Sequence, residues 1–219
     1  MSDERATDDA SIELDQPVRR HAADAFGFDA EPETFGDLWG RMMATFADAL
    51  GRPARATDLC TTDASPHRAV AGGESQSFRC VTDAFIYAGL RGGDVTVRTV
   101  SPLEGRGLSV EYDADGAVNA PDGAVLSFGV ERDASPPGGP VTPERMYGRV
   151  CPHSKAFVSR DEYERWAAAR PEVATQALPL DGALAALARL AGREFGGDGG
   201  REPRRGADEG CACVGEVDP

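Results

Sequence analysis

A thiol and a carboxylate lie three residues apart in the apolar stretch 77–87, at Cys80 and Asp83. If this stretch is helical, residues i and i+3 share one face, so the sulfur and the carboxylate can act on one bound group. The apolar neighbours in the stretch would exclude water from both. The simpler alternative is that Cys80 is a small buried hydrophobic residue and Asp83 a charge on the helix surface.

A second thiol lies in the segment Cys151-Pro152-His153-Ser154-Lys155, which contains the only lysine of the chain. Neighbouring cationic groups favour a thiolate over a thiol, whose ordinary pKa is about 8.5. The apolar residues on both sides of this segment are predicted to be strand ends. Lys155 is expected to do no more than favour the thiolate.

The remaining cysteines are Cys60, Cys211 and Cys213, which makes an odd total of five. A reducing compartment would keep most of them as thiols, so we interpret the cysteines as thiols available for chemistry rather than as a disulfide framework. Cys60 and His67 fall in a turn-rich region, residues 54–73, without the partner spacing of a metal site. Both are expected to be structural or exposed.

The elements that must position these groups are helices and short strands. Helices are predicted at 18–28, 34–50 and 180–195, and a further helix begins at Ser159. Thr34 with Asp37 and Ser159 with Glu162 form the capping boxes of two of them. Core packing explains the Met and aromatic stripe of the second helix, with a ligand pocket as the alternative. Alternating residues at 95–99, 108–112 and 125–130 predict strands joined by tight turns. These elements predict an α+β fold: a small mixed or antiparallel sheet flanked by helices, with a short helical N-terminal subdomain.

The 219 residues suit one main domain with short additions. We predict a disordered acidic leader at 1–16, a helical N-terminal subdomain at 17–73, the main domain at 74–195 and a flexible tail at 196–219. Both end segments carry too little apolar surface to fold.

The charge of the chain is strongly negative: 37 acidic against 23 basic residues give −14. Such a surface repels nucleic acid and anionic membranes, so neither is expected as a partner. Dense carboxylates with arginine in place of lysine suggest adaptation to a salt-rich, halophilic cytoplasm. The sequence has no apolar run of 18 residues and no signal-peptide pattern, so we expect a soluble cytoplasmic protein.

The order of the motifs resembles the organomercurial (alkylmercury) lyase family over about residues 77–195. The resemblance rests on Cys80 with Asp83, the strands that follow, Cys151-Pro152-His153 with Phe157, and the helix that Ser159 opens. It implies that Cys80 and Cys151 are catalytic cysteines that hold mercury, and that Asp83 handles the proton. Two departures are Ser101, in place of a further family cysteine, and Pro152, where members can carry another thiol.

The resemblance implies protonolytic cleavage of a carbon–mercury bond, giving a hydrocarbon and Hg(II), as in mercuric resistance and detoxification. No cofactor is expected, because mercury is substrate and product, but turnover would need an exogenous thiol. The Hg(II) acceptor would be a low-molecular-weight thiol or a mercuric reductase, with hand-off by the tail thiols Cys211 and Cys213 as a hypothesis. His153 is expected to support the site, since soft thiolates are the better mercury ligands.

The main alternative is a non-enzymatic thiol protein of the same fold that binds a soft metal, mercury or copper. Asp83 separates the two functions, because a simple binder has no use for a carboxylate beside its thiol. A zinc or redox module is disfavoured by the missing CxxC pairs, and a DNA-binding regulator by the net charge.

Overall fold

Helices and antiparallel strands are interspersed along the chain, which confirms the predicted α+β class. The computed structural model describes residues 12–134 and 143–194. Its helices are α1 (Gln16–Phe26), α2 (Phe35–Leu50), α3 (Val81–Arg91), α4 (Pro143–Val150), α5 (Arg160–Ala168) and α6 (Leu180–Glu194), with short 3-10 helices η1 (Ala56–Asp58) and η2 (Cys151–His153). Its strands are β1 (His67–Ala71), β2 (Glu74–Phe78), β3 (Val95–Val100), β4 (Gly107–Tyr112), β5 (Val118–Asn119), β6 (Val125–Glu131), β7 (Ala156–Phe157) and β8 (Val173–Pro179).

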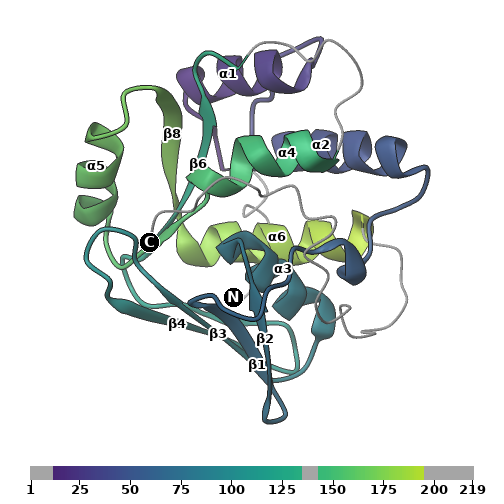
Figure 1. Cartoon of the computed structure of the whole chain (residues 1–219), viewed down its shortest axis with the longest axis vertical. Coiled ribbons are helices and arrows are strands. Elements are labelled where there is room, and N and C mark those ends of the chain that lie inside the picture. Colours follow the sequence, from purple (N-terminus) through teal and green to yellow (C-terminus); the bar gives the residue numbers. More distant parts are fainter. Residues whose placement is uncertain (1–11, 135–142, 195–219) are drawn as a thin grey trace, which may run out of the picture.

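The strands form two separate sheets rather than one. The larger sheet has the order β2-β1-β3-β4-β5 and the smaller the order β7-β6-β8, and all paired neighbours are antiparallel. Figure 1 shows the larger sheet at the bottom of the molecule with α3 and α6 above it. Its β3 and β4 bury alternate residues, as strands with one solvated face should, and β3 packs against α3.

The smaller sheet is buried on both faces, because β6 has apolar or small residues at nearly every position. Val125 faces a cluster with Phe157 and Trp166 beside α5. Phe128 faces the opposite way and meets Phe35 of α2 edge-on, with ring centroids 5.9 Å apart. The continuous apolar run of β6 therefore reflects two packing faces.

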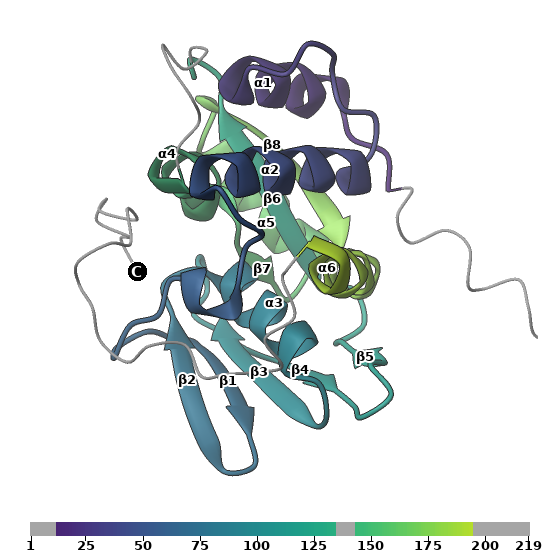
Figure 2. The same cartoon turned by 90° about the vertical axis from the view of Figure 1, so that its right-hand side faces the viewer.

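The amphipathic helix predicted after Thr34 is α2. The Thr34 hydroxyl accepts a hydrogen bond of 3.1 Å from the Asp37 N–H, and the helix ends at Gly51 in the left-handed conformation. Its apolar stripe packs between α6 and α4 (Figure 2). This places the stripe over the start of α3, which carries Cys80.

Residues before 17 already take part in the fold. The Phe35 N–H donates to the Ile12 carbonyl at 2.8 Å, and Leu14 is buried in the core. The predicted disordered leader at 1–16 therefore overlaps ordered residues at its end, while residues 1–11 lie outside the described part of the chain. The predicted tail at 196–219 also lies outside the described part of the chain.

Several elements were not predicted. The turn-rich region at 54–73 contains β1, which forms a hairpin with β2 through Gly72 and Gly73, both with positive φ. The smaller sheet gains β8 before the last helix. The prediction that a strand ends just before Cys151 is wrong, because helix α4 precedes it, opening with Pro143 where a proline is tolerated. On the other side of Cys151 the strand prediction is confirmed by β7.

Candidate active site

The start of α3 positions the first thiol and the carboxylate. Strand β2 ends at Phe78, and Cys80 is the N-cap of α3 with an extended backbone, φ −111° and ψ 138°. Asp83 is in the first turn of the helix, and each residue is only 3% exposed. The partial positive charge of a helix N-terminus favours negative charge at this position.

The second thiol lies where the chain leaves α4 and enters η2. Ser127 of β6 fixes this turn: its hydroxyl donates to the His153 carbonyl at 2.7 Å and accepts from the Lys155 N–H at 2.9 Å. Gly129 allows the close approach, because a Cβ there would lie 3.1 Å from the His153 Cβ. The middle strand of the smaller sheet thus determines where Cys151 lies.

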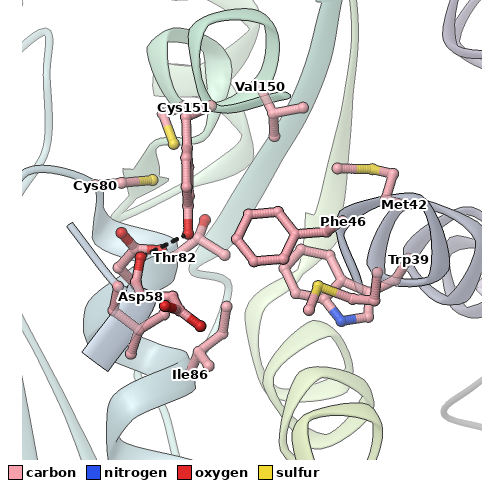
Figure 3. Close-up of a pocket in the computed structure, with 13 residues that line it drawn as sticks. Trp39, Met42, Phe46, Asp58, Cys80, Thr82, Ile86, Val150 and Cys151 are labelled. Atoms are coloured by element: carbon pink, nitrogen blue, oxygen red, sulfur yellow. Dashed lines mark hydrogen bonds between the residues drawn. The ribbon is translucent and has the colours of Figure 1, made fainter. Parts of the chain in front are cut away.

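The two thiols meet, although they come from distant parts of the sequence. Figure 3 shows the sulfur atoms of Cys80 and Cys151 facing each other, and neither residue is in a disulfide. A hydrogen bond with the Cys151 side chain lowers the pKa of Cys80, helped by the N–H groups of Thr82 and Asp83, against burial, which raises it. The pair is therefore suited to share one proton or to bind one soft metal ion.

Asp83 lies beside this pair, and its pKa is shifted in the opposite direction to that of Cys80. Burial and the negative charge of Cys80 raise the pKa of the Asp83 carboxyl well above its usual range, although the Cys60 N–H donates a hydrogen bond of 2.9 Å to its Oδ2. A buried site tolerates one negative charge better than two. The shifts favour negative charge on Cys80 over negative charge on Asp83.

These groups line one end of a pocket with a volume of about 40 Å³. The other lining residues are mostly apolar and come from α2, the η1 loop, α3 and α4: Trp39, Met42, Met43, Phe46, Asp58, Leu59, Thr82, Ile86, Tyr147 and Val150. The α2 stripe therefore serves both as core and as pocket wall. The sequence pattern signalled the helix, but not which cavity it would cover.

The cationic and imidazole groups around Cys151 differ in their charge. Burial first, and the charge of Lys155, lower the pKa values of His67 and His153 to about 4, so both are neutral at pH 7. The Nδ1 of His67 lies 2.7 Å from the Thr99 hydroxyl, away from the pocket lining. Lys155 is half-buried, and burial lowers its pKa, with negative charge on Cys80 and Cys151 opposing this shift.

The other residues singled out by sequence lie apart from the thiol pair. Cys60 is buried and presents its backbone N–H to Asp83, but its side chain does not line the pocket. Ser101 is buried and its hydroxyl accepts from the Arg106 N–H in the turn between β3 and β4. Cys211 and Cys213 lie outside the described residues.

A zinc-like cage is not formed by the described part of the chain. Within residues 12–134 and 143–194, no three His, Cys, Asp or Glu side chains are grouped closely enough to hold a metal ion. Two facing thiols are instead a pair of soft sulfur donors, which suits a soft ion better than zinc.

An α+β fold with two thiols and a buried carboxyl at one end of an apolar pocket defines a thiol-based site for a soft metal compound. The family model described as MerB, alkylmercury lyase, matches residues 60–192. The chain therefore belongs to the alkylmercury lyase family, as its motif order predicted.

Other comparisons are more distant. One solved structure, "Crystal structure of the mercury-bound form of MerB2", is 17% identical, with a TM-score of 0.44. The match covers 58% of this chain and 60% of that one. No curated protein matches the chain in sequence. None of the described helices is long and apolar enough to span a bilayer.

Proposed function

We propose that the protein is an organomercurial lyase that cleaves the carbon–mercury bond by protonolysis. The observation that carries the proposal is the position of Asp83, a buried carboxyl with a raised pKa, beside two facing thiols. Cys80 and Cys151 act as the catalytic cysteines and Asp83 as the proton carrier. Membership of the family supports this reaction class.

The chemistry follows from the softness of mercury. Sulfur binds R–Hg⁺ in preference to oxygen or nitrogen, and a second sulfur on the metal increases the electron density on the attached carbon. The carbon leaves with its bonding electron pair and takes a proton from Asp83, which recovers a proton from a thiol as that sulfur binds mercury. In balance, R–Hg⁺ and two thiols give R–H, Hg(II) held by two thiolates, and one released proton.

Product release requires acceptors for Hg(II). We propose that two low-molecular-weight thiols, or a mercuric reductase, take the ion from Cys80 and Cys151 by ligand exchange. The tail thiols Cys211 and Cys213 are proposed as an intermediate station, since tethered thiols have a high effective concentration. Deleting residues 196–219 should then slow the transfer of Hg(II) and leave methane formation unchanged.

The test is head-space detection of methane from methylmercury with excess small thiol in high salt. The wild type should release methane, and Cys80→Ser, Cys151→Ser and Asp83→Ala should lose nearly all of it. Asp94→Asn, an exposed carboxylate outside the pocket lining, is the matched control and should retain activity. Mercury binding by the wild type without any methane would instead support the non-enzymatic thiol protein.

A further inference from the structure

The pocket has two chemically different ends. One end carries Cys80, Cys151 and Asp83, and the opposite wall is formed by apolar side chains of α2 (Figure 3). All the α2 wall residues precede residue 60, where the match to the family model begins. The family match therefore covers the thiols and part of the pocket lining, such as Ile86 and Val150, but not the α2 wall.

The free space at this wall is small. The whole pocket has a volume of about 40 Å³, much less than the cavity of about 150 Å³ that holds a benzene molecule. Methyl and ethyl are the organic groups that need the least movement of the walls. A long alkyl chain or an aromatic ring fits only if a wall residue moves.

Phe46 is the wall residue held most firmly. It is 4% exposed, and its ring packs edge-on against Tyr147 with centroids 5.8 Å apart and an interplanar angle of 85°. The Tyr147 hydroxyl in turn donates to the Asp58 carbonyl at 3.2 Å. These contacts tie α2, α4 and the η1 loop together at this point.

The two methionines of the wall differ from Phe46 in stiffness. Met42 and Met43 are unbranched side chains that change rotamer at low cost. A group slightly larger than ethyl can therefore be accommodated by their movement. Displacing Phe46 would require breaking its packing with Tyr147, which makes its ring the limit of the pocket.

We propose that the α2 wall restricts the substrate to short alkylmercury compounds, and that Phe46 is the residue that sets the size limit. The inference rests on the proposed function and adds the substrate class to it. Phe46 acts through the shape of the pocket and takes no part in the proton transfer.

The test uses the full chain and a series of primary alkylmercury compounds: methyl, ethyl, n-butyl and n-hexyl. All carry mercury on a saturated carbon, so the series varies chain length with only small changes in intrinsic reactivity. Wild-type kcat/KM should fall at least about tenfold from ethyl to n-hexyl, and Phe46→Ala should reduce this fall to about threefold or less. Phe46→Leu, which retains more packing, should give a smaller change in the same direction.

Phe28→Ala is the matched control, since Phe28 is an aromatic residue packed beside Phe26 and outside the pocket lining. This variant should keep the wild-type size dependence. The inference is overturned if the wild type cleaves n-hexylmercury about as fast as ethylmercury, or if both Phe46 variants keep the wild-type ratio. If the wild type cleaves no member of the series, methylmercury included, the proposed function fails and the inference with it.

Discussion

The backbone N–H of Cys60 donates a hydrogen bond of 2.9 Å to Oδ2 of Asp83. This bond links the loop before β1 to the first turn of α3 and holds a carboxyl that is almost fully buried. It stabilises the ionised form, yet burial and the neighbouring Cys80 outweigh it and raise the carboxyl pKa. Asp83 is thus oriented by an N–H donor and still has a raised pKa, which favours its protonated form.

Asp83→Asn should separate function from stability. The amide oxygen can still accept the Cys60 N–H, but the side chain cannot deliver a proton, so methane release should fall by about 10²–10⁴-fold. Mercury binding by the two thiols should remain. Retention of methane release at the wild-type rate would contradict the role proposed for Asp83.

The same variant has a pH-dependent effect on stability. The pKa of Asp83 is raised on folding, so its protonated form favours the fold below the unfolded pKa, and that stability is lost as the pH rises through the folded pKa. Asp83→Asn removes this loss. The variant should therefore gain thermal stability over the wild type at pH 8 and not at pH 3, as measured by calorimetry.

The buried histidines should make the fold sensitive to acid. The folded pKa of His67 is about 4, below its ordinary value of 6.5, so the unfolded chain binds the proton more readily. Stability should be lost as the pH falls from 6.5 towards 4, by up to about 3 kcal/mol for this residue at 1.36 kcal/mol per unit.

His67→Gln should flatten this part of the stability curve, measured by urea unfolding at a series of pH values. His153, with the same lowered pKa, accounts for the slope that remains. His21→Gln on α1 is the matched control and should leave the curve unchanged. An unaltered slope in His67→Gln would contradict the prediction.

Lys155 should favour the thiolates of the pocket. Burial lowers the pKa of Lys155, but negative charge on Cys80 and Cys151 opposes that shift, and by reciprocity the ammonium favours the two thiolates. Lys155→Gln should shift the pH profile of iodoacetamide alkylation to higher pH, whereas Lys155→Arg keeps the charge and should shift it little. Identical profiles for wild type and Lys155→Gln would show that the charge does not act on the thiols.

Gly129 should be intolerant of a side chain. A Cβ at this position of β6 would lie 3.0 Å from the Thr175 Cβ and 3.1 Å from the His153 Cβ, so η2 would have to move. Gly129→Ala should destabilise the fold by about 1–3 kcal/mol and reduce cleavage by displacing Cys151. Gly107→Ala, where nothing lies within 4 Å of the added Cβ, is the control. Equal unfolding midpoints for the two variants would count against this packing argument.

Local sequence determined the elements whose signals are short in range. The spacing of Cys80 and Asp83 was predictive because both lie within one helical turn, and Thr34 and Ser159 marked real helix starts because capping involves the next three residues. Strands β3 and β4 were visible because each has one solvated face and therefore alternates.

Tertiary structure alone decided which of these residues meet. Cys80 and Cys151 come from elements far apart in the sequence, with η2 held against α4 and β6, and no local pattern encodes the contact between the two thiols. Strand β8 was missed because its pairing partner β6 is distant in sequence. The α2 wall is a further example. Its apolar stripe shows that this face of the helix must be buried, but which cavity the stripe lines depends on where the rest of the chain places the thiols.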